Sequence, residues 1–258
     1  MLLTFPLSVR RLAAGAVMGG YVYVVGGTVN TPTHGEIPNV ERLLLNASSS
    51  AEWVEVAPMG RTRQMHACGV VRDQRLYCTG AYAGDNTAEV YDASTNVWTS
   101  IASMSQKRYG HAAVGFGDRL YVFGGNYRNY DLTPTCEMYD PGSDSWSNLA
   151  TPPSLVVNVA GAALGSYIYL TGGYTGGSAK SLVQRYNPHT DEWNLVAPMA
   201  APRSDHGAAT VQGYLYVVGG TEGTLAVERY DATNDTWSHV RSFPAPGVYS
   251  APVVVGWG

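Results

Sequence analysis

The chain has 258 residues, a mild net charge of -4 and only 14% charged residues. It lacks the basic excess of nucleic-acid-binding domains, so no nucleic-acid partner is expected. The high glycine and tyrosine contents (30 and 18 residues) are typical of a protein with many strands and tight turns. Pro6, Arg10 and Arg11 interrupt the first apolar stretch, and no run of about 18 apolar residues follows. We therefore expect a soluble cytoplasmic protein without membrane contact.

An aromatic and β-branched run that ends in glycine recurs along the chain. Its five copies are YVYVVGG (21–27), RLYCTGA (75–81), RLYVFGG (119–125), YIYLTGG (167–173) and YLYVVGG (214–220). A tryptophan follows each copy in step, at Trp53, Trp98, Trp146, Trp193 and Trp237. Two independent markers that share a period of roughly 47 residues indicate an internal repeat.

Each repeat contains four short segments with strand character. A small-residue run comes first, then the run that ends in glycine, then a run with period two, then a run that opens with tryptophan. The third run ends in Tyr-Asp or Tyr-Asn in four repeats, whereas the first repeat has Leu43-Leu44. One four-stranded antiparallel sheet per repeat predicts an all-β propeller with five four-stranded blades. We expect a single domain over 1–258, with repeats at approximately 10–58, 64–103, 109–152, 157–198 and 204–242.

The sequence is compatible with two ways of closing the ring. The inner-strand pattern occurs a sixth time, at 248–256, without the other three strands of a blade. The ring therefore has five blades, or it has six and the last blade is incomplete. Phe5-Pro6 and Phe243-Pro244 stand at the same phase of the repeat, which favours five.

The recurrent glycines, tyrosines and tryptophans are expected to be structural. A glycine at the end of the second strand lets the backbone approach a neighbouring element closely. The large rings supply the apolar surface that packs one blade onto the next. The second repeat has Ala81 in place of the second glycine, so we expect close approach or positive φ to be relaxed there.

The order of glycine pair, Tyr-Asp and tryptophan, with the phrases VERYD (227–231) and VAPM (196–199), resembles the kelch repeat. The likeness extends over essentially the whole chain and is greatest to the kelch-like (BTB-kelch) substrate adaptors. It implies a protein-interaction module that binds a partner protein or peptide on one face of a propeller. It also implies a role as the substrate receptor of a cullin-type ubiquitin ligase, reached only through a BTB region that these residues do not contain.

The resemblance implies a binding face made by two sets of loops. The loops after the glycines begin at Thr28, Tyr82, Asn126, Tyr174 and Thr221, and the loops before the inner strands contribute Arg11, Gln64, Tyr109, Val156, Ser204 and Tyr249. The loop at 126–135 concentrates Tyr127, Arg128 and Tyr130, side chains of the kinds that often dominate binding energy. Arg128 is the leading candidate.

Two further sets of residues recur at fixed positions of the repeat. Arg63, Arg108 and Arg203 would suit a basic ring for an acidic peptide, but their recurrence favours bracing of the loops through backbone carbonyls. Similarly, His66, His111 and His206 are expected to be structural residues at blade interfaces rather than metal ligands. No metal or cofactor is predicted.

No catalytic motif is found, so no catalytic residue is assigned. Some kelch propellers are enzymes, among them a copper oxidase and a sialic acid mutarotase. A small-molecule or sugar-processing enzyme at the channel mouth is therefore the alternative, with Asp205 and His206 as an acid and base beside Arg203.

Three cysteines are too few for a disulfide framework or a zinc site, which favours a reducing compartment. Cys68 and Cys78 fall on neighbouring strands of one hairpin, so a bridge is conceivable. Two separate buried thiols are favoured, and no role is assigned to them.

Overall fold

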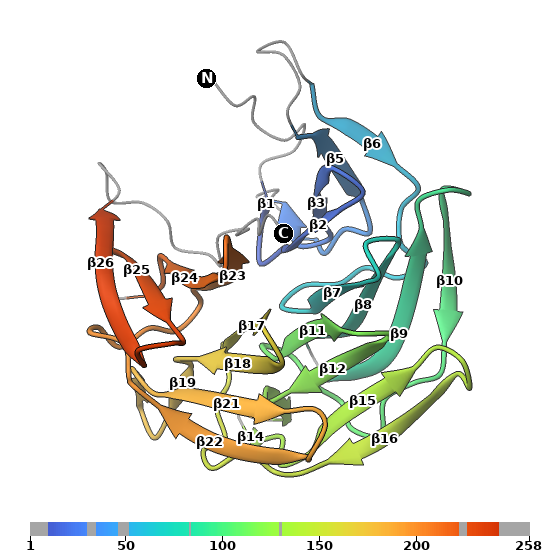
Figure 1. Ribbon diagram of the computed structural model, residues 1–258. Helices are drawn as coiled ribbons and strands as arrows, with labels where there is room; N and C mark the ends of the chain where they lie inside the picture. Colours follow the sequence, from blue (N-terminus) through green and yellow to red (C-terminus); the bar gives the residue numbers. More distant parts are fainter. Residues whose placement is uncertain are drawn as a thin grey trace.

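The computed structural model describes residues 10–29, 35–45, 52–82, 84–128, 131–221 and 226–242. Five four-stranded antiparallel sheets surround a common centre, with the first strand of each sheet innermost (Figure 1). The predicted all-β propeller of five four-stranded blades is confirmed. The described residues contain no helix with the length and apolar character needed to span a membrane.

The strands of each blade follow one another in sequence from the inside outward. Blade one consists of β2 (Ala14–Met18), β3 (Tyr21–Val25), β5 (Val40–Leu44) and β6 (Val54–Val56), and blade two of β7 (Ala67–Val71), β8 (Arg75–Ala81), β9 (Asp85–Asp92) and β10 (Val97–Ile101). Blade three consists of β11 (Ala112–Phe116), β12 (Arg119–Phe123), β15 (Cys136–Asp140) and β16 (Ser145–Leu149), and blade four of β17 (Ala160–Leu164), β18 (Tyr167–Thr171), β21 (Val183–Asn187) and β22 (Glu192–Val196). Blade five consists of β23 (Gly207–Val211), β24 (Tyr214–Val218), β25 (Ala226–Asp231) and β26 (Thr236–Ser242).

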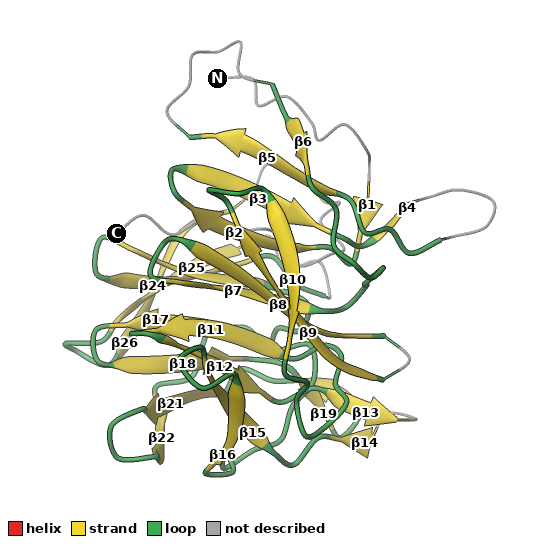
Figure 2. Ribbon diagram, turned by 90° about the vertical axis from the view of Figure 1, so that its right-hand side faces the viewer, coloured by secondary structure: helices red, strands yellow, loops and turns green. Residues whose placement is uncertain are grey.

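Three short strand pairs extend the loops that follow the glycines. They are β1 (Arg10–Arg11) with β4 (Thr28–Val29), β13 (Asn126–Arg128) with β14 (Asp131–Leu132), and β19 (Tyr174–Thr175) with β20 (Ser178–Ala179). In the side view these extensions lie on one side of the propeller (Figure 2). We call this side the glycine-loop face and the opposite side the hairpin face.

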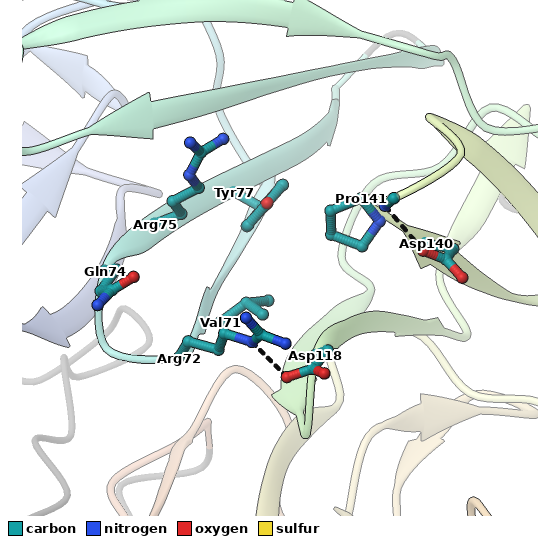
Figure 3. Close-up of a pocket in the computed structure, with 9 residues that line it drawn as sticks. Val71, Arg72, Gln74, Arg75, Tyr77, Asp118, Asp140 and Pro141 are labelled. Atoms are coloured by element: carbon teal, nitrogen blue, oxygen red, sulfur yellow. Dashed lines mark hydrogen bonds and ion pairs between the residues drawn. The ribbon is translucent and has the colours of Figure 1, made fainter.

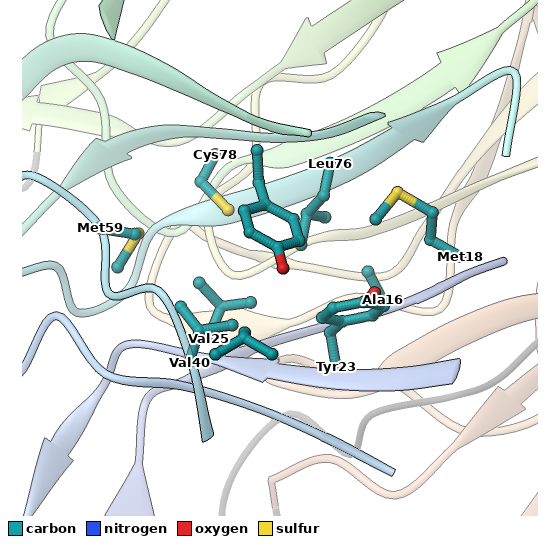
Figure 4. Packing of buried hydrophobic residues seen from close by; sticks show 10 residues of the cluster. Ala16, Met18, Tyr23, Val25, Val40, Met59, Leu76 and Cys78 are labelled. Carbon is teal, nitrogen blue, oxygen red and sulfur yellow. The ribbon is translucent and has the colours of Figure 1, made fainter. Parts of the chain in front are cut away.

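Neighbouring blades meet through their inner strands, from β2 through β7, β11 and β17 to β23. Between blades one and two, Tyr23 and Val25 pack with Leu76 and Cys78 in a buried apolar cluster (Figure 4). Full burial of side chains of this size stabilises the fold by about 1.5–3 kcal/mol each. The sixth inner-strand pattern, 248–256, lies outside the described residues.

An outer set of hydrogen bonds also joins neighbouring blades. The Trp98 indole N–H donates to the Ala57 carbonyl of blade one (2.9 Å), and the Ala57 N–H donates to the Asn96 side chain (3.0 Å). Asn96 also accepts from the Tyr91 hydroxyl (2.9 Å). We call this set of hydrogen bonds the outer clasp. The next three interfaces repeat it with Trp146, Ala102, Asp144 and Tyr139; with Trp193, Ala150, Asp191 and Tyr186; and with Trp237, Ala197, Asp235 and Tyr230. The structural role of tyrosine and tryptophan is confirmed, but their shared polar partner was not anticipated.

The glycine pairs fit the backbone of the neighbouring blade. A Cβ added to Gly172, where φ is +60°, would lie 2.4 Å from the Arg203 carbonyl oxygen, and Gly173 has φ +95°. Ala81 does not have positive φ, and β8 continues through it to pair with Asp85. The expected relaxation in blade two is confirmed.

Cys68 on β7 and Cys78 on β8 are joined in a disulfide. The expectation of two separate thiols is wrong, because the two residues stand directly opposite each other, with Cα atoms 4.2 Å apart. Cys136 is free, and burial raises the pKa of its thiol to about 12.

Candidate partner-binding face

The glycine-loop face has a hollow of about 430 Å³, here called the rim hollow. Its lining residues are Met65, Tyr82, Tyr109, Asn126, Val157, Asn158, Tyr174, Ser204, Asp205 and Thr221. Six of them belong to the set carried over from the kelch resemblance: Tyr82, Tyr109, Asn126, Tyr174, Ser204 and Thr221. The fold thus brings these six together, although they come from blades two to five.

Tyrosines form the exposed part of this hollow. Tyr82 is 48% exposed and Tyr174 is 41% exposed. The Tyr82 ring contacts buried Tyr109 edge to face, with ring centroids 5.3 Å apart. Tyr109 is itself fixed by two backbone hydrogen bonds of 2.9 Å with Asn126. The aromatic surface is therefore partly open to solvent and held on a rigid base.

The polar groups of the rim hollow are mostly neutral. The hydroxyls of Ser204 and Thr221 are hydrogen-bonded at 2.8 Å. The Asp205 carboxylate accepts from Ser204 at 3.3 Å and from the Asn158 amide at 3.2 Å, and burial raises the pKa of Asp205. The Oδ1 atom of buried Asn126 has no hydrogen-bond partner among the described residues.

A ladder of backbone hydrogen bonds links the blades beside the hollow. The N–H of Met65 donates to Leu12, that of Gly110 to Met65, that of Asn158 to Gly110 and that of Asp205 to Asn158, over 2.6–3.1 Å. All five residues have positive φ, between 52° and 60°. Four of them are not glycine, so this conformation was hard to predict from the residue types.

Among the remaining predicted residues, those that the structure describes do not line the rim hollow. Exposed Arg11 pairs through its backbone with buried Thr28, and Gln64 donates to the Glu36 carboxylate at 2.9 Å. Tyr127 is 37% exposed on β13. The side chain of Arg128 and the whole of Tyr130 and Tyr249 lie outside the described residues.

Val156 is not a rim residue. It is buried and occupies the place that arginine has in the other blades. The Gly125 N–H donates to the Val156 carbonyl in the same way as the Gly173 N–H donates to the Arg203 carbonyl. The next residue, Val157, lines the hollow. The prediction for this blade was wrong by one position because blade four lacks the arginine that sets the alignment.

The recurrent arginines brace the blades and do not form a basic ring. Arg108 is fully buried, donates to the Gly124 carbonyl at 3.0 Å and to Thr135, and forms an ion pair with Glu137. Arg63 pairs with Glu89, Arg203 with Glu228 and Arg10 with Glu41 in the same way. Bracing is confirmed, and the glutamate partners were missed.

The recurrent histidines lie between blades. His111 Nε2 is 2.8 Å from the Thr79 hydroxyl and His206 Nε2 is 2.8 Å from the Thr171 hydroxyl, so the structural role of these two histidines is confirmed. Burial, together with the positive charge of nearby Arg203, lowers the pKa of His206 to about 3. The side chain of Asp205 bonds to Ser204 and Asn158 instead of His206, so the suggested acid and base are not paired.

The hairpin face has a different hollow of about 490 Å³ between blades two and three (Figure 3). Arg72 and Asp118 form an ion pair across it, and Arg75 pairs with Asp92 at 3.5 Å beside it. Its aromatic lining residue, Tyr77, is buried. Exposed charges that neutralise one another characterise this side, whereas exposed tyrosines characterise the rim hollow.

Comparison with known proteins gives a consistent result. The family model "KLHDC2/KLHL20/DRC7 Kelch-repeats domain" matches residues 70–248. Kelch-like protein 36 of Rattus norvegicus is 27% identical over 121 residues, which are 46% of this chain and 19% of the relative. Kelch-like protein 26 of Danio rerio is 32% identical over 116 residues, 44% of this chain and 19% of the relative. The matched stretch is thus about a fifth of the length of these relatives.

Two further matches bear on the blades. Kelch repeat and BTB domain-containing protein 8 of Danio rerio is 34% identical over 86 residues, 29% of this chain and 14% of the relative. The solved structure titled "Structure of YjhT" superposes with a TM-score of 0.79 at 17% identity, and covers 96% of this chain and 89% of that one. At 17% identity, the match to this solved structure shows a shared fold.

Proposed function

Because this chain belongs to the kelch-repeat family, we propose that it is a protein-interaction module whose rim hollow binds a segment of a partner protein. The kelch-like relatives support an interaction role for the propeller as a whole. The choice of the rim hollow depends on its geometry and on its position among the loops that follow the glycines.

The observation that carries this proposal is the convergence of tyrosines from three blades. Tyr82, Tyr109 and Tyr174 come from blades two to four and share one hollow. Tyrosine has a large apolar ring and a polar tip, and it is over-represented among residues that dominate binding energy. A partner side chain that enters the hollow would cover the exposed parts of Tyr82 and Tyr174. The loop with Tyr127 and Arg128 would extend this contact at the edge.

The charges around the rim hollow favour a partner segment of low net charge. Arg63, Arg108 and Arg203 are neutralised by glutamates and fully buried, so they are not available to an acidic peptide. The Oδ1 atom of Asn126 offers a buried acceptor, which costs free energy unless a donor reaches it. A backbone N–H or side-chain amide of the partner would meet this need.

We further propose that the protein acts in a ubiquitin ligase. The propeller would select the substrate, and the link to a cullin would require a BTB region. The printed name of one relative joins kelch repeats to a BTB domain. Co-purification of a cullin with the propeller alone would contradict this division of roles.

The enzyme alternative has weaker support from the geometry. The hollow at the channel mouth measures about 90 Å³ and is lined by His66, His111 and His206 among others. Ligand pockets usually measure about 300–1,000 Å³. Two of these histidines are engaged by threonine hydroxyls of the preceding blades.

The decisive experiment compares the two faces. The variant Tyr82→Ala with Tyr174→Ala removes exposed rings from the rim hollow, and Arg72→Ala with Asp118→Ala removes an exposed ion pair from the hairpin face. Proteins captured by each variant and by the wild type would be identified and quantified by mass spectrometry. We expect the first variant to lose specific partners and the second to retain them, with both unfolding near the wild-type midpoint. Identical partner lists for all three proteins would overturn the proposed binding face.

A further inference from the structure

His66 differs from the other two recurrent histidines in its partner. The residue before the first glycine of the preceding blade is Thr79 for His111 and Thr171 for His206, and its hydroxyl bonds to the imidazole. For His66 the corresponding residue is Val25. Both ring nitrogens of His66 are consequently buried without a hydrogen-bond partner among the described residues. Such groups are rare in native proteins and call for a physical explanation.

Two sulfur atoms lie beside this unpartnered imidazole. One ring nitrogen of His66 and the Sγ atoms of Cys68 and Cys78 all lie within 4.8 Å of one another. At the Cys68 position the other blades have Gly15, Ala113, Gly161 and Ala208, and at the Cys78 position Val24, Val122, Leu170 and Val217. The two thiol residues therefore depart from the repeat at the place where the histidine lacks its hydroxyl.

We propose that reduction of the Cys68–Cys78 disulfide creates a three-coordinate site for Cu(I), with His66 as the third ligand. A dithiol reductant transfers two electrons and two protons, which breaks the S–S bond, leaves two thiols and converts the reductant to its own disulfide. Binding of Cu(I) then displaces the thiol protons into solvent. The disulfide and the metal site exclude each other because they use the same sulfur atoms.

The donor set selects the metal. Thiolates are soft ligands that suit Cu(I) and zinc, and imidazole suits both. Structural zinc is almost always bound by four protein ligands. The described residues place only these three donors together, which fits the lower coordination number of Cu(I).

The surroundings provide both access and shielding. His66 lines the small hollow beside the inner strands, and Cys68 is only half-buried, so the site is not closed off from solvent. Cys78 is fully buried in the apolar cluster between blades one and two (Figure 4). None of the three residues lines the rim hollow, although the small hollow that His66 lines shares Met65, Asn158 and Asp205 with it.

The test measures Cu(I) binding to reduced protein under anaerobic conditions, in competition with the chelator bicinchoninate. A Cys136→Ser background removes the remaining thiol. We expect one Cu(I) per reduced chain and none per oxidised chain. The variant His66→Val should weaken binding at least about tenfold. Valine is suitable because Val159 occupies this position in blade four, and His206→Val is the matched control, which should bind as the wild type does.

A second measurement does not depend on cysteine variants. Cu(I) should raise the unfolding temperature of the reduced wild type and of His206→Val by more than it raises that of His66→Val. Complete loss of Cu(I) to the chelator, equal binding by His66→Val, or tighter binding of Zn²⁺ than of Cu(I) in a parallel titration would each overturn the proposal.

Discussion

Blades three and four have the same order of four antiparallel strands but different buried side chains near their inner strands. Blade three has the ion pair of Arg108 and Glu137, and its histidine, His111, bonds to Thr79 of blade two. Blade four has Val156 in place of the arginine and Gln184 in place of the glutamate. Its counterpart of His111 is Val159, which packs in an apolar cluster with Phe123, the counterpart of Thr79.

The difference shows that these side chains are replaced in matched sets. Gln184 accepts from the Ser154 N–H at 2.8 Å, as Glu137 accepts from the Ser105 N–H at 2.7 Å. The backbone contact is therefore kept when the charge is removed. A lone change would leave a buried charge or a buried polar group without its partner, which costs more than either complete set.

The largest expected effect comes from replacing the buried arginine of blade three while keeping its glutamate partner. In Arg108→Val, Glu137 stays buried without its countercharge, so we expect the free energy of unfolding to fall by about 3–5 kcal/mol. Urea denaturation at pH 7 measures this loss. Adding Glu137→Gln reproduces the pair of Val156 and Gln184 in blade four and should restore most of the lost free energy of unfolding. If the double variant is no more stable than Arg108→Val, the two residues do not form an interchangeable unit.

The second glycine of the pair, which blades three and four share, has positive φ in both and leaves no room for a Cβ atom. In Gly173→Ala, positive φ and the Cβ contact with Val156 at 2.8 Å should cost about 1–3 kcal/mol, measured as above. The matched control is Ala81→Gly, at the corresponding position of blade two, where φ is not positive. It should change stability by less than Gly173→Ala does, and equal losses would show that the glycine position is not specially constrained.

The histidine interfaces should make stability depend on pH, unlike the valine interface of blade four. His206 has its pKa lowered to about 3 by burial, whereas an unfolded histidine titrates near about 6.5. The unfolded chain therefore binds a proton that the folded chain does not, so stability is lost as pH falls from about 6.5 toward 3. His206→Val should reduce this slope by about 1.4 kcal/mol per pH unit between pH 6 and 5. Parallel stability curves for the two proteins would contradict the assignment.

The sequence predicts the fold well because the features that build the blades recur. Glycine runs and tryptophans mark five blades, and six of the residues that line the rim hollow were named by placing the binding loops of the kelch family on positions after or before these markers. Partners in a neighbouring strand or blade were harder to predict. Nothing in the sequence around Glu137 and Asp144 indicates their arginine, tyrosine or backbone partners. Because blade four lacks the arginine, the rim residue of this blade was predicted at Val156 instead of Val157.

The smallest expected effect concerns the outer clasp, which blades three and four share. Trp146 donates to Ala102 at 2.7 Å and Trp193 donates to Ala150 at 2.9 Å, and the carboxylates of Asp144 and Asp191 have the same relation to these alanines. Trp146→Phe and Trp193→Phe keep a ring but lose this hydrogen bond, so each should cost about 1 kcal/mol in urea denaturation. The two losses should agree, since the outer clasp does not change where the inner side chains do. A clearly larger loss for Trp193→Phe would mean that blade four, which lacks the inner ion pair, depends more on its outer clasp, and that the two regions of a blade compensate for each other.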